Sequence, residues 1–370
     1  MKQSIKLILG MALLVALPLF LASCDDILGE WDRPTPAVVT PSEPETPPTP
    51  EEIIYAFSLR NLADDADVAA TALKVTDQAG TEIATATSDG KYTIKKDDLG
   101  SATMLWLEAI TATGKYIQKV KIEDLPAIAE AGKLTMATLG NVIGADGKFY
   151  ADKAAVDAAS TTGVAMIVYL GNEGESSTKY NRGLAIALSD ASTGATWGPG
   201  VDAGLTKYTT WCSTTPAATD ANTDMAGLAN TATLVTKAGT DANYQAGKAA
   251  ADYKNTVAAP AGFSDWFLPS AGQWYKFLNG MYGFTWTTYG SAGGTDSDNY
   301  NTANKAFVDA GYDTPPNDAR FGSGSAVYYW SSSEYDNNNA MRVAFSSTIG
   351  VYVHYSTKSY NNSVRSFLAF

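Results

Sequence analysis

The stretch GFSDWFLPSAGQWYKFL, residues 262–278, gives the clearest structural signal in this chain of 370 residues. Ser270 and Gln273 have the spacing of a capping box, in which each side chain accepts a hydrogen bond from the backbone N–H of the other residue. The apolar residues that would share one helical face are Trp274, Phe277 and Leu278. The sequence therefore predicts a helix that starts at Ser270 and buries an aromatic face.

Apolar runs around this helix predict strands, so residues 139–370 are expected to form an α+β domain. Residues 163–170 and 183–188 are compact runs rich in Val, Ile and Ala, which is typical of buried strands. After about residue 326 the pattern indicates strands and loops only. Two further helices are expected, over residues 241–254 and 302–310.

Residues 52–138 carry short β-type runs separated by turn signals. Residues 71–75 alternate apolar and polar side chains, a Ser-Asp-Gly turn follows at 88–90, and further runs lie at 104–110 and 116–122. Several strands at this spacing predict a small all-β, Ig-like sandwich that precedes the larger domain. The segment resembles the β-sandwich modules of fimbrillin-type surface lipoproteins, which implies a role in presenting the domain that follows.

The N-terminus resembles a bacterial lipoprotein signal. Two lysines precede an apolar run over residues 7–22, and the run ends in small residues followed by Cys24. The resemblance implies removal of residues 1–23 and lipidation of Cys24. A membrane-spanning helix is disfavoured because the run is short for a bilayer and contains Pro18.

Residues 24–51 are predicted to be a Pro-rich linker. Seven of the chain's fifteen prolines lie between Arg33 and Glu51, which favours extended conformers that cannot bury a core. The composition fits a functional stalk and a disordered remnant equally well. Asp25 and Asp26 look like the acidic tag of surface-exposed lipoproteins, so the resemblance implies a lipid-anchored protein of the outer membrane, displayed on the cell surface.

Composition excludes several function classes. The chain has one histidine and two cysteines, and imidazole and thiolate are the usual ligands and bases at neutral pH, so we expect no metal site, no cofactor and no catalysis. Its 26 basic and 39 acidic residues give a net charge of -13, which repels nucleic-acid phosphates. With Cys24 lipidated, Cys212 stands alone, and its role is left open.

Three motifs together suggest a family for residues 139–370. They are the stretch 262–270, the sequence YWSSSE at 329–334, and Val364-Arg365 near the terminal Ala369-Phe370. They resemble the C-type-lectin-like domain at the C-terminus of Lcl-type surface proteins and related bacterial lipoproteins. The resemblance implies a C-type-lectin-like fold that binds a ligand, although ligands vary widely in this family.

The last part of the chain, about residues 335–366, also resembles the variable region of proteins diversified by retroelements. In that family, mutagenesis at adenines rewrites asparagine codons into a restricted set of residues. Within residues 335–363 only Met341 and Lys358 lie outside that set, so the resemblance implies that both are fixed. The asparagines at 337–339 and 361–362 are what unmutated positions would look like.

Composition near the C-terminus agrees with a binding surface. Residues 321–370 hold 6 Tyr, 11 Ser and 5 Asn, the residue types that dominate antibody paratopes. Tyrosine supplies rigid amphipathic area there, and Ser and Asn supply adaptable hydrogen bonds. The alternative, that these are ordinary strand and turn residues of a secreted β-protein, stays open.

Strand periodicity predicts which side chains are displayed. Met341, Val343 and Phe345 alternate with Arg342 and Ala344, and after a turn near 346–350 the residues Val351, Val353 and Tyr355 alternate with Tyr352 and His354. The Val and Phe set is expected to face the core, and the other set to share one outward face. The predicted ligand-binding residues are Tyr335, Asp336, Asn337, Asn338, Asn339, Arg342, Ala344, Ser346, Tyr352, His354, Ser356, Ser359, Tyr360 and Asn361.

The favoured function is a surface-displayed ligand-binding lipoprotein. Its partner would be an unidentified protein or glycan; the membrane would be contacted only through the lipid, and nucleic acid would not be bound. The alternative is a structural subunit of a fimbria or an adhesin. An enzymatic role is disfavoured: sulfatase-activating oxidases share the lectin-like fold but use paired cysteines, which this chain lacks once Cys24 is lipidated.

Two acidic segments carry oxygen ligands of the kind that calcium binds. Asp220-Ala221-Asn222-Thr223-Asp224 starts like a calcium loop, but Met225 stands where glycine is needed and Thr231 where a bidentate glutamate is needed. It is predicted to be a polar surface loop. Residues 296–299 offer oxygen ligands without a defining spacing, so calcium there stays open.

Overall fold

The computed structural model describes residues 52–211, 217–284, 296–322, 326–348 and 350–370. The predicted signal peptide, nearly all of the linker, Cys24 and Cys212 lie outside these residues. Residues 51–370 form one compact unit. Its described part is a mixed α+β structure with four sheets and six α-helices.

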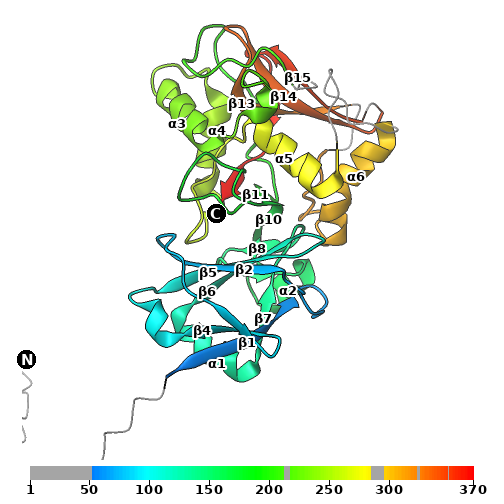
Figure 1. Cartoon of the computed structure of the whole chain (residues 1–370). Coiled ribbons are helices and arrows are strands. Elements are labelled where there is room, and N and C mark those ends of the chain that lie inside the picture. The colour runs from blue at the N-terminus through cyan, green and yellow to red at the C-terminus, as the bar shows by residue number, and fades with distance from the viewer. Residues whose placement is uncertain (1–51, 212–216, 285–295, 323–325, 349) are drawn as a thin grey trace, which may run out of the picture. The chain divides into compact units, whose positions relative to one another are not determined.

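Residues 54–136 form two sheets that enclose one core (Figure 1). The first has the order β3-β4-β1-β7, with β1 and β7 parallel, and the second has the order β2-β5-β6. Their inward residues are apolar, and Phe57, Ile94 and Leu107 are fully buried. The elements are β1 (Ile54–Asn61), β2 (Ala72–Asp77), β3 (Ala86–Ser88), β4 (Lys91–Lys95), η1 (Lys96–Leu99), β5 (Met104–Ile110), β6 (Lys115–Lys121), η2 (Ile122–Asp124), α1 (Leu125–Ala131) and β7 (Lys133–Met136).

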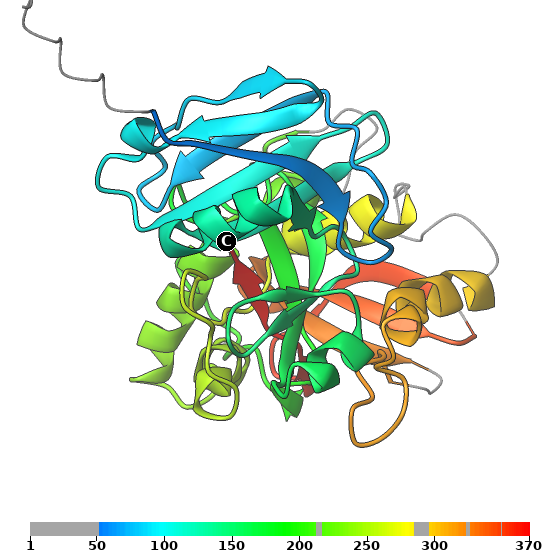
Figure 2. The same cartoon turned by 90° about the horizontal axis from the view of Figure 1, so that it is seen from below.

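An antiparallel sheet with the order β17-β11-β10-β8-β9 follows. The predicted strands are confirmed, because β10 spans Gly163–Leu170 and β11 spans Gly183–Ala187. The last strand, β17 (Phe367–Ala369), returns to pair with β11, so the red C-terminal strand lies beside the green ones in Figure 2. The remaining elements of this sheet and its flank are β8 (Val142–Gly144), β9 (Phe149–Tyr150) and α2 (Lys153–Ala158).

The other sheet has the order β12-β16-β13-β14-β15. Its strands are β12 (Ser192–Ala195), β13 (Val327–Glu334), β14 (Asn339–Ser346), β15 (Gly350–Thr357) and β16 (Asn362–Val364). The helices around it are η3 (Ala221–Thr223), α3 (Gly227–Ala238), α4 (Gln245–Asp252), η4 (Tyr253–Asn255), α5 (Ala271–Tyr282) and α6 (Asp296–Asp309). Strands β13, β14 and β15 lie side by side in Figure 1.

Helix α5 confirms the prediction made from the capping box. The Ser270 hydroxyl accepts a hydrogen bond from the backbone N–H of Gln273, and the Gln273 side chain accepts one from the backbone N–H of Ser270. Trp274 and Phe277 are fully buried between the two sheets of the larger part. Trp266 and Trp330 are buried too, so these tryptophans serve the core rather than a ligand cleft.

The other predicted helices are present with shifted limits. Helix α4 begins four residues later than predicted, and α6 begins six residues earlier. Helix α3 was not predicted, since its sequence is rich in threonine, which is a weak helix former. Its hydroxyls bond within the helix: those of Thr231 and Thr236 donate to the carbonyls four residues earlier. The buried Thr231 hydroxyl also accepts a hydrogen bond from the backbone N–H of Leu268 at 2.9 Å, and Leu234 is fully buried, so tertiary contacts stabilise this helix beyond its weak propensity.

Candidate binding face and its anchor

Strands β13, β14 and β15 have two unlike faces. The inner face carries residues that are almost completely buried against α5 and α6, as the alternation predicted. They are Tyr329, Met341, Val343, Phe345, Val351 and Val353. Phe345 also stacks on Phe321 with ring centroids 3.7 Å apart. This side of the sheet is thus committed to the core.

The outer face has two rows of side chains across the three strands. Tyr328, Ala344 and Tyr352 face one another in the first row, and Arg342 lies opposite His354 in the second. Ala344 is fully buried between the two tyrosines, so its prediction as a displayed contact residue is wrong. Tyr328 takes its place; it was missed although the alternation of β13 extends to it.

Polar and aromatic contacts join these side chains into one group. The Arg342 guanidinium lies 3.7 Å from the centre of the Tyr328 ring, and its Nε donates a hydrogen bond to Nε2 of His354 at 3.1 Å. Tyr352 stacks on His354 with centroids 5.4 Å apart, and its hydroxyl donates to the Tyr328 hydroxyl at 3.1 Å. We call Tyr328, Arg342, Tyr352 and His354 the outer cluster.

The electrostatics of the outer cluster follow from partial burial. Burial lowers the pKa of His354, and the positive charge of Arg342 lowers it further. The imidazole accepts a hydrogen bond at Nε2, so the neutral form carries its proton on Nδ1. Burial also lowers the pKa of Arg342, and the groups that act against this shift are tyrosines rather than carboxylates. Among the described residues, no carboxylate forms an ion pair with Arg342. The outer cluster therefore presents a positive charge although the chain as a whole is acidic.

The loop between β13 and β14 is held by its own side chains. The Asp336 carboxylate accepts hydrogen bonds from the backbone N–H groups of Asn338 and Asn339 at 2.7 and 2.8 Å. Burial acts to raise the pKa of Asp336, but hydrogen bonds from the Asn339 side chain and from these two backbone N–H groups lower it. Tyr335 stacks on Tyr355, with centroids 4.0 Å apart. Tyr355 shares the register of the buried valines but is 49% exposed, because β15 is an edge strand and is open near its end.

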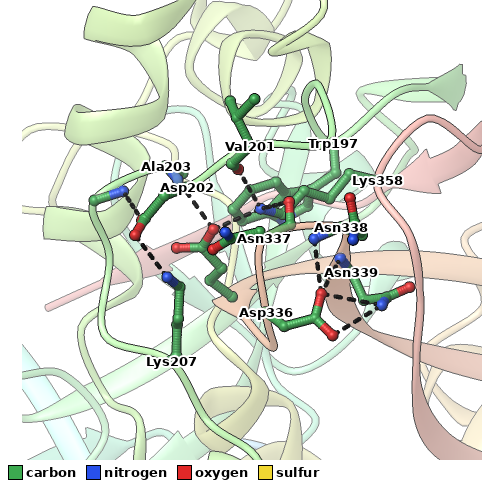
Figure 3. Close-up of polar contacts among 12 residues, drawn as sticks. Trp197, Val201, Asp202, Ala203, Lys207, Asp336, Asn337, Asn338, Asn339 and Lys358 are labelled. Atoms are coloured by element: carbon green, nitrogen blue, oxygen red, sulfur yellow. Dashed lines mark hydrogen bonds and ion pairs between the residues drawn. The ribbon is translucent and has the colours of Figure 1, made fainter.

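Lys358 anchors this loop from within the structure (Figure 3). Its ammonium donates to the Glu334 carboxylate at 2.5 Å, to the Val201 carbonyl at 2.8 Å and to the Asn337 carbonyl at 2.9 Å. It also lies 4.9 Å from the centre of the Trp197 ring. Both charged side chains have no exposed surface. Burial lowers the pKa of Lys358, and Glu334 opposes this shift.

The segment 197–207, which we call the anchor loop, completes this arrangement. The backbone N–H of Trp197 donates to the Lys358 carbonyl at 2.8 Å, and the backbone N–H of Ala203 donates to the Glu334 carboxylate at 3.0 Å. An ion pair between Lys207 and Asp202 closes the loop at 2.6 Å (Figure 3). The loop of residues 335–339 is therefore fixed by residues more than a hundred positions away in sequence.

The remaining predicted site residues divide into two groups. Ser346 and Ser356 are buried, so their prediction as ligand contacts is wrong. The Ser346 hydroxyl is taken up by the β14–β15 turn, where it bonds to Thr348. Ser356 faces Ala340, which is buried next to Trp197. The exposed residues are Asn337, Asn338, Ser359, Tyr360 and Asn361, with Tyr360 at 58% exposure.

The segment 220–224 is not a surface loop as predicted. Asp224 is buried and accepts hydrogen bonds from the side chains of Ser333 and Asn230, at 2.6 and 3.1 Å. Its backbone carbonyl accepts one from Ser270 at 2.5 Å. Burial raises the pKa of Asp224. The segment therefore ties β13 to the start of α5.

The described residues contain neither metal-ligand groups nor membrane-spanning helices. They hold no group of three or more His, Cys, Asp or Glu side chains placed to bind a metal ion. Within the same ranges, no helix combines the length and the apolar character needed to cross a bilayer.

Comparisons with known proteins give a partial match. A family model described as a domain of unknown function (DUF8237) matches residues 294–367, which include the outer cluster and Lys358. No curated protein matches the chain. Among solved structures, the chain is similar to a fimbrial protein from Bacteroides ovatus, with 13% sequence identity and a TM-score of 0.42, covering 86% of this chain and 71% of that chain.

Proposed function

We propose that this protein is a lipid-anchored protein of the outer membrane surface whose β13–β15 outer face and adjoining loops bind a protein or glycan ligand, without catalysis. The observation that carries the proposal is the unlike character of the two faces. One side of three strands is core, and the other presents aromatic, imidazole, guanidinium and amide groups. Such groups supply contact area and adaptable hydrogen bonds in known paratopes.

A C-type-lectin-like fold for residues 139–370 belongs to the same proposal. Its support is that the C-terminal strand β17 pairs with β11, which lies beside β10. The strands between β11 and β17 in the chain, β12 to β16, form a second sheet. Loops mounted on such a closed scaffold can vary while the scaffold keeps its core.

We further propose that residues 335–363 are diversified by a retroelement. The two residues outside the reachable set support this, since Met341 lies in the core and Lys358 is the buried anchor. Of the five asparagines, Asn337, Asn338 and Asn361 are exposed as display positions should be, whereas Asn339 is half-buried and Asn362 is buried. A fixed skeleton therefore alternates with replaceable positions along one short segment.

The DNA around the gene tests the diversification directly. We expect a nearby template repeat that differs from the coding stretch for residues 335–363 only at adenines, together with a reverse transcriptase gene. The codons for Met341 and Lys358 should be identical in both copies. A repeat that differs at other bases, or no repeat at all, refutes this part of the proposal.

Binding is tested with the double variant Tyr352→Ala/His354→Ala on the full mature chain. We expect only a small fall in the thermal midpoint together with loss of ligand capture at the cell surface, because both side chains are half-buried and bond mainly to each other, Tyr328 and Arg342. The matched control is Lys254→Ala on the exposed η4 segment. Retained capture would contradict the binding face, and polymers of the chain on cells would favour the fimbrial alternative.

A further inference from the structure

A cavity of about 540 Å³ lies away from the outer cluster, where β6 and α1 meet the β8–β9 turn. Its volume falls in the ~300–1,000 Å³ range of small-molecule sites. One part of its wall is apolar and comes from β5, β6, α1, β7 and β9. These apolar residues are Met104, Val120, Ile128, Leu134 and Phe149.

Lys119 gives the cavity a partly buried cation. Its ammonium donates a hydrogen bond to the Ala261 carbonyl at 2.9 Å and lies 4.7 Å from the centre of the Phe263 ring. The backbone at Gly147 lies close to the Lys119 ammonium, since a Cβ added to Gly147 would stand 3.1 Å from the Lys119 nitrogen. Gly147 has a positive φ of 75°, which lets this turn approach. The cation is therefore built into the wall rather than extended into solvent.

The charges around the cavity are mostly positive, although the whole chain is acidic. Four lysines and two aspartates line it, namely Lys119, Lys121, Lys133, Lys148, Asp124 and Asp146. Lys121 pairs with Glu123 and Lys133 pairs with Asp65, at 2.9 and 3.1 Å. Within the described part of the chain, Lys119 and Lys148 take part in no ion pair, and the nearby Asp146 carboxylate acts on Lys119 only through its charge. These two cations stand beside an apolar wall.

We propose that this cavity binds an amphipathic carboxylate, with its anionic group at Lys119 and Lys148 and its apolar chain against Val120, Ile128 and Leu134. An anion hydrogen-bonded to the Lys119 ammonium would offset the free-energy cost of burying that charge. The apolar wall would supply the hydrophobic part of the binding free energy. This site is independent of the ligand-binding face.

The proposal implies a pH dependence with a definite sign. Burial lowers the pKa of Lys119 to about 8, and Asp146 opposes the shift. A bound carboxylate favours the protonated amine, so it raises this pKa. Affinity is then complete just below pH 8, where the ligand's carboxylate is also ionised, and falls as pH rises above 8, by up to about tenfold per pH unit. The other charged groups that line the cavity are Asp124, Asp146, Lys121, Lys133 and Lys148.

Titration calorimetry with decanoate tests the proposal, on the full mature chain carrying Cys24→Ser to prevent lipidation. We expect saturable binding at one site, with about tenfold weaker binding of decyltrimethylammonium, which has the same chain and the opposite charge. Lys119→Gln should weaken decanoate binding about tenfold and abolish its pH dependence. Lys179→Gln, at an exposed lysine beside Tyr180, should change neither.

A second variant covers the case in which Lys119→Gln disturbs the contact with Ala261. Ala131→Trp places a large ring into the cavity from the exposed end of α1 and leaves every contact of Lys119 in place. It should block decanoate while the thermal midpoint holds. Equal binding of the two probes, or decanoate binding that survives both variants, overturns the proposal, as does binding to anionic phospholipid vesicles without binding to decanoate.

Discussion

Replacing Lys358 by methionine is expected to destabilise the protein strongly, although the residue lies within the segment proposed to vary. Methionine keeps much of the apolar stem and removes the ammonium, which makes three hydrogen bonds and lies against Trp197. The substitution leaves the Glu334 carboxylate buried without its counter-ion. Breaking one side of a buried ion pair costs about 3–5 kcal/mol, so urea denaturation should show a loss of that size.

Two companion variants separate the buried pair from general charge effects. Lys207→Met breaks the neighbouring pair with Asp202, which is partly exposed, and should cost less than about 1 kcal/mol. The double variant Lys358→Met/Glu334→Gln removes the unpaired charge and should recover part of the loss. A cost for Lys358→Met no larger than that for Lys207→Met would refute the anchoring role.

Three smaller predictions concern other contacts. His354, the only histidine in the chain, should titrate by NMR below its ordinary pKa of 6.5, and Arg342→Gln should raise its pKa because a neighbouring positive charge is lost. Since the unfolded chain binds that proton more readily, the free energy of unfolding should fall as pH drops below about 6.5, and a flat pH profile would contradict this. Tyr355→Ala should cost about 0.5–1.5 kcal/mol in urea denaturation through loss of stacking on Tyr335, and no change would mean that the rings do not stack. Gly183→Ala should cost about 1–3 kcal/mol, because its Cβ would stand 2.5 Å from the Phe370 ring and 2.6 Å from the Tyr169 carbonyl oxygen, and a neutral result would contradict this close packing.

Local patterns in the sequence predicted the parts of the fold that depend on local interactions. The start of α5 follows from Ser270 and Gln273, which bond to each other within one turn. The strand β10 follows from its apolar run, which needs no partner to be recognised. The inward residues of β14 follow from a period of two, since large apolar side chains alternate there with alanine and polar residues.

The exposure of a side chain was predicted wrongly where its neighbours come from distant parts of the chain. Ala344 lies on the outward face as its register requires, but two tyrosines from neighbouring strands cover it. Ser356 is buried because its end of the sheet packs near Trp197, over 150 positions earlier. Asp224 is buried for the same reason, through Ser333 of β13. Periodicity gives the direction of a side chain, whereas exposure depends on what packs above it.

Residues 335–363 are proposed to combine a fixed skeleton with a replaceable display surface, which is the central claim about this protein. A saturation scan of this segment, scored by protease resistance of the displayed full mature chain, tests the claim most directly. Positions expected to tolerate most substitutions are Asn337, His354, Ser359, Tyr360 and Asn361. Met341, Val343 and Lys358 should tolerate almost none. Display positions as intolerant as these three would contradict the claim, because those side chains would then be part of the fold.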